Sequence, residues 1–302
     1  MTTRRRFLAI SAAAFAYPGI AAAQPVYTWQ GVALGARATL RLAHPDAKAI
    51  SARVAGEISR LEDIFSLYRP DSALMELNRA GVLNAPPFEL LECLSLVSAV
   101  YRASDGRFDP TVQPLWRCYG DASALGALPN PDALTRAQAL TGWSKVTVDS
   151  TAIAMRPGMA LTLNGIAQGY IADQVATMLT AEGLGNILID TGEFRAIGTQ
   201  PDGRAWPVKL AAGGEVALAA RALATSAPLG TTFDAAGQVG HILDPRSGVS
   251  SPSNWREITV SAPSAALADA ISTAACLCAT RGQIDSVAAQ FGDVRVEAAH
   301  PA

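Results

Sequence analysis

The chain has 302 residues, of which half are hydrophobic and 17% are charged, so it can bury a large core and is not intrinsically disordered. Its 24 basic and 26 acidic residues give a formal net charge of −2, which argues against nucleic-acid binding through a strongly basic surface. Three histidines and four cysteines are too few for a scaffold built on several zinc ions or many disulfides.

The N-terminus has the pattern of a cleavable export signal. Three arginines at 4–6 precede Phe-Leu and an apolar, alanine-rich stretch that ends at 21–23. Paired arginines at this place are typical of the twin-arginine signal. A membrane anchor is the alternative, but Pro18-Gly19 interrupt the apolar run well before the roughly 20 residues that a span needs. We therefore expect a signal peptide over 1–23 and a mature chain, 24–302, in the periplasm or peripheral to the inner membrane.

Helical and strand periodicities then alternate along the chain. In chain order they predict a helix over 48–67, a short helix after Ser72, a helix over about 88–104, a surface loop with a short helix over 119–139, strands at 146–148, 152–155 and 160–163, and a helix over 165–182. The second half continues with strands at 186–190, 194–198, 206–210, 222–225 and 257–262, a helix over 264–280 and a strand near 293–297. No repeat or flexible linker is evident. We expect one α+β domain, in which long helices pack on one side of an antiparallel or mixed sheet.

The cysteines give little sign of redox chemistry. Cys93, Cys276 and Cys278 lie in apolar stretches, where a thiol usually serves as a small core residue. Whether Cys118, beside Trp116, forms a disulfide stays open, because sequence alone does not decide disulfide pairing.

The last predicted helix carries the sharpest local pattern. Asp269 and Thr273 are four residues apart and so lie on one face, and both offer oxygen ligands to a hard divalent cation. Alternatively, Asp269 favours the positive end of the helix dipole and Thr273 bonds back to a backbone carbonyl. Taken alone, this structural explanation is favoured.

Three further stretches are candidates for a site. At 163–170 a strand turns into a helix through Asn164-Gly165, a geometry that aims N–H groups at an anion, and close backbone approach is expected at Gly165 and Gly169. His241 sits on a short apolar strand immediately before a Pro-containing turn. An Asp-Pro turn at 106–112 follows a helix. Each of them alone is also common in purely structural settings.

Taken in order, the stretches resemble one family. They are 65–72 with 77–78, 108–112 with 114–116, 164–170 with 172–173, 190–193, 224–226, 241–248 and 268–273. In sequence and spacing they resemble the ApbE family of FAD:protein FMN transferases, across nearly the whole mature chain. The resemblance implies a single ApbE-like, T-fold-related domain. It also implies that FMN is transferred from FAD to a Ser or Thr hydroxyl of a partner flavoprotein, with Mg²⁺, releasing AMP.

The same resemblance assigns residues to roles. Asp269, Thr273 and the backbone carbonyl of Gly165 match the metal-binding positions, and His241 matches the histidine that takes the proton from the acceptor hydroxyl. The flavin-nucleotide contacts map to Leu34, Tyr68, Phe108, Asp109, Thr162, Gln168 and Leu243. The expected partners are FAD and a periplasmic or membrane-bound electron-transfer flavoprotein, with no nucleic acid.

The chain departs from the family pattern at four positions. Thr162 stands where Asp is common and Gln168 where Lys is common, which suggests that a hydrogen bond between neutral side chains has replaced an ion pair. Ala227 and Thr191 each replace a usual glycine. Two alternatives therefore stay open: a pyrophosphatase that hydrolyses FAD to FMN and AMP, and a non-catalytic periplasmic protein that binds or delivers FAD.

Overall fold

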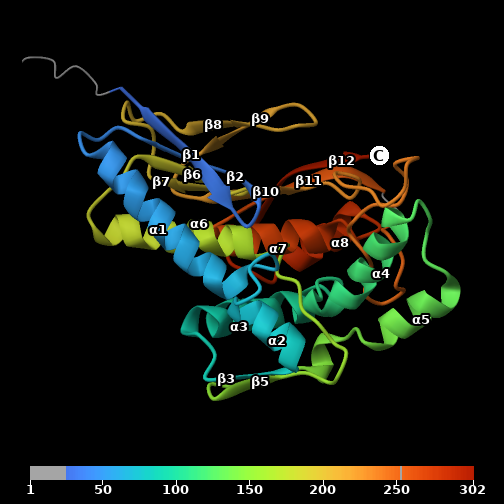
Figure 1. The fold of residues 1–302 in the computed structure, drawn as a ribbon. Coiled ribbons are helices and arrows are strands. Elements are labelled where there is room, and N and C mark those ends of the chain that lie inside the picture. The colour runs from blue at the N-terminus through green and yellow to red at the C-terminus, as the bar shows by residue number, and fades with distance from the viewer. Residues whose placement is uncertain (1–24, 252–253) are drawn as a thin grey trace, which may run out of the picture.

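The computed structural model describes residues 25–251 and 254–302, and the predicted signal peptide lies outside this part of the chain. Its centre is a seven-stranded antiparallel sheet with the strand order β1-β2-β6-β7-β10-β11-β12 (Figure 1). The strands are β1 (Tyr27–Ala33), β2 (Ala36–Leu42), β6 (Ile187–Asp190), β7 (Phe194–Ile197), β10 (Ala222–Ser226), β11 (Trp255–Ala262) and β12 (Arg295–Pro301).

Helices cover one face of this sheet in two layers (Figure 1). In chain order they are α1 (Ala47–Phe65), α2 (Ala73–Ala80), α3 (Phe88–Ala103), α4 (Gln113–Ala124), α5 (Pro131–Ala139), α6 (Ala167–Ala181), α7 (Ala265–Ala275) and α8 (Arg281–Ala288). The central helix α7 packs against β10, β11, α6 and α3, and nine of its eleven residues are buried. A helix enclosed in this way is expected to be mostly apolar, and α7 consists of Ala, Leu and Ile apart from Asp269, Ser272 and Thr273. The expected single α+β domain with helices on one side of the sheet is confirmed.

A separate hairpin covers the opposite face of the sheet. It consists of β8 (Trp206–Lys209) and β9 (Glu215–Leu218), and it buries Trp206 and Leu218 against Leu188 and Leu223. A small third sheet, β3-β5-β4, joins β3 (Val82–Asn84), β5 (Ala152–Ala154) and β4 (Thr147–Val148) below the helices. Cys93, Cys276 and Cys278 are core residues, as predicted, and Cys118 is a free, half-buried thiol.

Three predicted elements differ from the structure. Helix α4 spans Gln113–Ala124, so the loop expected from residue 119 begins only after Ala124. The helix expected over 264–280 ends at Ala275, and the chain turns through Cys276–Cys278 before Thr280 caps the separate helix α8. The strand expected at 160–163 forms no ladder. Instead, the side chain of Asn78 pairs with Leu161 as a neighbouring strand would, accepting from its N–H at 2.7 Å and donating to its carbonyl at 2.9 Å. This pairing holds the segment that leads into the site described below.

Replacing Asn78 with alanine should therefore destabilise the fold. The substitution leaves a buried backbone N–H and carbonyl without partners, which costs about 1–3 kcal/mol of unfolding free energy. Urea denaturation measures this loss. The matched control is Arg79→Ala, an exposed position on the same helix, where a change below about 0.5 kcal/mol is expected. Equal effects of the two substitutions would show that Asn78 does not hold the segment.

No helix in the described part of the chain is both long and apolar enough to cross a membrane.

Candidate active site

A cavity of about 430 Å³ opens where α7, the start of α6, the end of β10 and the segments 107–116 and 230–243 meet. This volume lies within the usual range of small-molecule sites. Nine of the eleven residues singled out from the sequence line it: Phe108, Asp109, Thr162, Gly165, Gln168, His241, Leu243, Asp269 and Thr273. Segments that are far apart in the sequence are thus brought together at one place.

Asp269 is buried in the middle of α7, with only 3% of its surface exposed. It does not serve the start of the helix, because Ser264 caps that end and the carboxylate of Asp173 accepts from the N–H groups of Ala265 and Ala266, each at 2.9 Å. The structural explanation favoured by the pattern alone is therefore wrong. Among the described residues, the Asp269 Oδ2 atom has no hydrogen-bond partner. Burial raises the pKa of this carboxyl to about 8.

A chain of hydroxyl groups orients Thr273. Ser272, not Thr273, donates to the backbone carbonyl of Asp269, at 3.0 Å. Because the Ser272 proton is used there, Ser226 must donate in its 2.7 Å contact with Ser272. Thr273 must then donate in its 3.3 Å contact with Ser226. The Thr273 oxygen is left with its lone pairs free, as a metal ligand requires.

Gly165, just before α6, and Gly169, within α6, allow this part of the chain to lie close to α7. A Cβ atom at Gly165 would lie 3.0 Å from the Thr273 hydroxyl and 3.3 Å from the ring of Phe108. A Cβ atom at Gly169 would lie 2.4 Å from the backbone of Ala265, so α6 and α7 touch there through their main chains. The close approach expected at both glycines is confirmed, and it places the 165 backbone beside Thr273.

His241 lies on the same cavity, in a segment held by backbone pairing. Its N–H donates to the carbonyl of Thr231 at 3.0 Å, and its ring Nδ1 lies 3.1 Å from the same carbonyl. A carbonyl only accepts, so Nδ1 carries the proton and Nε2 is left as a base. Burial lowers the pKa of the imidazole below its ordinary 6.5, although the carbonyl contacts oppose this.

Asp109 lines the cavity, but its carboxylate oxygens already accept hydrogen bonds from other groups of the protein. It accepts from the backbone N–H and the hydroxyl of Thr111, at 2.8 and 2.5 Å, and from the N–H of Trp143 at 2.9 Å. Burial raises its pKa, while these hydrogen bonds oppose the rise. The side chain therefore shapes the wall that Phe108 and Leu243 share, and both of these side chains are buried.

The two unusual residues at 162 and 168 do not form the expected pair. The Thr162 hydroxyl accepts from the N–H of Asn164 at 3.3 Å, and the Thr162 N–H donates to the carbonyl of Pro110. The Gln168 amide instead lies against Gly192, where an added Cβ atom would be 2.8 Å from its Nε2. In the described structure no hydrogen bond joins the two side chains, so the hypothesis that they replace an ion pair as a couple is not supported.

Leu34 and Tyr68 lie together, away from the lining of the cavity. Leu34 is at the turn between β1 and β2, where its N–H donates to Glu62 Oε1 at 2.7 Å. The ring of Tyr68 lies beside the neighbouring Gly35, and 73% of its surface is exposed. Their assignment as nucleotide contacts stays a prediction.

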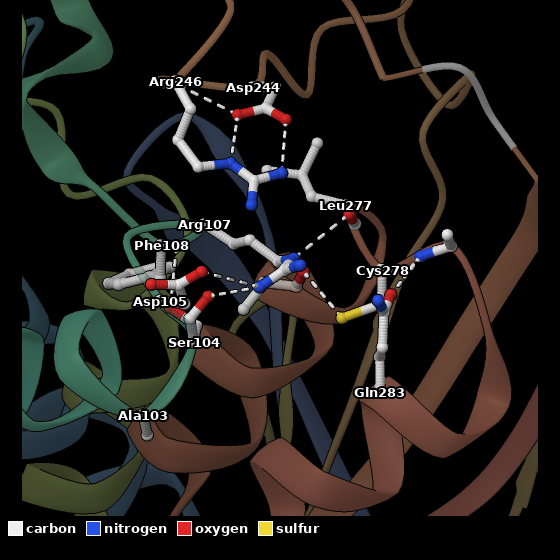
Figure 2. A network of polar contacts seen from close by, with 12 residues as sticks. Ala103, Ser104, Asp105, Arg107, Phe108, Asp244, Arg246, Leu277, Cys278 and Gln283 are labelled. Carbon is white, nitrogen blue, oxygen red and sulfur yellow. Dashed lines mark hydrogen bonds and ion pairs between the residues drawn. The ribbon is translucent and has the colours of Figure 1, made fainter.

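Sequence reasoning missed two charged residues of the cavity, Arg107 and Glu193. Figure 2 shows Arg107 beside the turn that follows α7, where its guanidinium donates to the carbonyls of Ser104 at 2.9 Å and Leu277 at 3.4 Å. Arg246 lies nearby and is paired with Asp244. Glu193 follows the β6–β7 turn and is also buried. The acidic stretch 190–193 was the available signal for Glu193.

The comparison with known proteins agrees with this geometry. A family model described as the ApbE family matches residues 34–296. The chain belongs to the ApbE family. An FAD:protein FMN transferase of Klebsiella pneumoniae is 29% identical over 247 residues, covering 78% of this chain and 77% of that protein. One of Chlamydia pneumoniae is 31% identical over 224 residues, covering 71% of each.

Solved ApbE structures share the fold. The apo form of the Pseudomonas stutzeri flavinyl transferase ApbE superposes with a TM-score of 0.77 at 26% identity, covering 88% of this chain and 90% of that one. The flavin transferase ApbE of Vibrio cholerae gives the same TM-score at 22% identity, covering 90% and 93%. The sequence resemblance to ApbE proteins thus extends to the overall fold.

Proposed function

We propose that this ApbE-family chain transfers FMN from FAD to a Ser or Thr hydroxyl of a partner flavoprotein, with Mg²⁺ as the cofactor and AMP as the second product. Its relatives carry the name FAD:protein FMN transferase. The observation that carries the proposal is the buried Asp269 Oδ2 atom, unpartnered within the described residues, in a cavity that also holds Thr273, Gly165 and His241.

The residues at Asp269 fit a magnesium ion. Across the described residues, no three His, Cys, Asp or Glu side chains gather as they do in an all-protein metal cage. Mg²⁺ is instead commonly held by one or two carboxylates, with waters and substrate phosphates as the other ligands. Asp269, the Thr273 hydroxyl and the Gly165 carbonyl would hold it here. When bound, it would neutralise the charge on the diphosphate of FAD and polarise the bond that breaks.

The side chains around the cavity account for the rest of the reaction. His241 Nε2 accepts the proton of the acceptor hydroxyl as that oxygen bonds to the phosphorus of the FMN half, and the bond from this phosphorus to the AMP oxygen breaks. The Nδ1 contact to Thr231 fixes the ring for this task. Arg107 adds a positive charge to a cavity that must accept an anionic dinucleotide.

The acceptor is an exported electron-transfer flavoprotein in this proposal. Its support is the twin-arginine pattern at the N-terminus, which would bring the folded enzyme to the periplasm. Cell fractionation and N-terminal sequencing of the secreted chain test it. A protein found only in the cytoplasm with residues 1–23 intact would contradict the export.

The transfer itself is tested by incubating the purified chain with FAD, Mg²⁺ and a flavoprotein domain that contains an acceptor threonine. Mass spectrometry should show the acceptor gaining FMN, and chromatography should show one AMP released for each FMN attached. AMP and free FMN without labelled acceptor would instead indicate a pyrophosphatase. Tight FAD binding without AMP release would indicate a carrier protein.

Ser226→Ala should weaken the reaction moderately. The substitution removes the acceptor of the Thr273 proton, and one such hydrogen bond contributes about 1 kcal/mol, equivalent to roughly a fivefold loss of kcat/KM. Steady-state transfer assays measure it. Ser286→Ala, which removes a hydroxyl from α8 that bonds only within its own helix, is the matched control and should leave the rate unchanged. Equal rates for both variants would show that the hydroxyl chain does not orient Thr273.

A further inference from the structure

Asp269 is accompanied in the cavity by a second buried carboxylate, that of Glu193. The two residues come from different elements, α7 and the turn before β7, yet both line the cavity. Glu193 is 8% exposed and Asp269 is 3% exposed. Burial and the nearby Asp269 carboxylate raise the pKa of Glu193 well above its ordinary value. In their ionised forms, two acids at this depth are costly unless a positive charge accompanies them.

The described part of the protein places only one cationic side chain on the cavity that holds the Asp269 and Glu193 carboxylates. Arg107 is the only described Lys or Arg side chain that lines the cavity, and it is held by the carbonyls of Ser104, at the end of α3, and Leu277, in the turn after α7. The side chain that packs against Gly192, the residue before Glu193, is the neutral amide of Gln168. The unpartnered Oδ2 atom of Asp269 lies in the same cavity and likewise needs a cation.

We infer that Glu193 is the second carboxylate of the cation site, and that together with Asp269 it lets the chain bind a divalent cation before FAD arrives. This inference deepens the proposed function, since it concerns the same cation. It also assigns a role to Gln168. A neutral side chain at 168 leaves both acids available to the cation, whereas a lysine there would place an ammonium group beside Glu193 and compete with it.

Cation binding without FAD tests the inference. Isothermal titration with Mg²⁺ and Mn²⁺ titration followed by electron paramagnetic resonance should give at least a tenfold weaker Kd for Glu193→Gln than for the unchanged chain. Gln168→Lys should weaken binding in the same direction. Glu257→Gln is the matched control, because Glu257 is also a buried glutamate but does not line the cavity. A change below twofold is expected for it.

Thermal melting supplies a readout that is independent of cation affinity. In EDTA, Glu193→Gln should melt at a higher temperature than the unchanged chain, because one of two neighbouring buried acids is removed. It should also lose most of the stabilisation that Mg²⁺ gives. The inference is overturned if Glu193→Gln binds Mg²⁺ as tightly as the unchanged chain, or if Glu257→Gln weakens binding equally. Should Glu193→Gln fail to fold, Gln168→Lys decides, and unaltered binding by that variant overturns the inference.

The outcomes also separate this inference from the proposed function. FMN transfer by a chain whose Glu193→Gln variant binds Mg²⁺ normally would retain the function and reject the role of Glu193. Glu193-dependent Mg²⁺ binding by a chain that does not attach FMN would do the reverse.

Discussion

Asp269→Asn should reduce FMN transfer by at least about a thousandfold, because a catalytic metal supplies several kcal/mol of transition-state stabilisation and each 1.4 kcal/mol is a factor of ten. The substitution keeps the shape of the side chain and removes its charge. Since the carboxyl is buried with an unpartnered oxygen in the described structure, the fold should not suffer, and the melting temperature in EDTA should be equal or higher. Transfer assays across a Mg²⁺ series, together with thermal melting, measure both effects.

Asp173→Asn is the instructive comparison for that variant. It alters the carboxylate that accepts from the first two N–H groups of α7, so it should cost about 1 kcal/mol or more of stability, as the loss of a helix cap does. Transfer well below its melting temperature should persist. The reverse pattern, with activity surviving in Asp269→Asn, would mean that the buried acid at 269 has only a structural task.

His241→Ala should slow transfer by about a hundred- to ten-thousandfold, the usual contribution of a general base. Binding of FAD and Mg²⁺ should be retained, because the imidazole holds neither the cation nor the helices. Equilibrium binding, measured beside kcat, separates the two effects. A variant that transfers FMN at the original rate would exclude this residue as the base.

The pH profile gives a second test of His241. Burial disfavours the charged imidazolium, so the folded pKa lies below the ordinary 6.5 and the ring is the neutral base at pH 7 and above. At saturating Mg²⁺, which keeps the Asp269 carboxyl ionised, the rate should therefore be flat from pH 7 upward and fall as pH decreases through this lowered pKa of His241. The residual activity of His241→Ala should lack that acidic decline. A decline centred above pH 7 in the unchanged chain would point to another base.

Long periodic segments made much of the fold predictable, whereas short elements depended on tertiary contacts. The helices over 47–65 and 88–103 carry enough turns for their spacing to be unambiguous. The β1–β2 hairpin was not predicted, because its turn is Leu34-Gly35, with φ angles of 50° and 84°, rather than the Asn-Gly that commonly signals such turns. The Glu62 side chain, distant in sequence, holds Leu34 in this conformation.

In the candidate site, too, local spacing was predictable from the sequence, whereas tertiary contacts were not. Asp269 and Thr273 could be placed on one helical face from their spacing, but the burial of Asp269 and the capping of α7 by Asp173 are tertiary facts. Sequence alone therefore favoured the wrong explanation for Asp269, and only the order of several motifs pointed to a metal. The stretch 190–193 was matched to the family, but Glu193 was assigned no role, because a glutamate in a turn after a strand has no periodicity to reveal where its side chain lies.

The main-chain contact of Gly169 with Ala265 has a consequence for how the enzyme tolerates change. This contact sets the separation between α6 and α7. Gly165 lies just before α6, and Asp269 and Thr273 lie on α7. The spacing of the three proposed oxygen ligands therefore depends on Gly169, which has no side chain and is not itself a proposed ligand. A larger residue at position 169 would push the two helices apart. It would therefore reduce activity as the loss of a proposed ligand would, although all three proposed ligands would still be present.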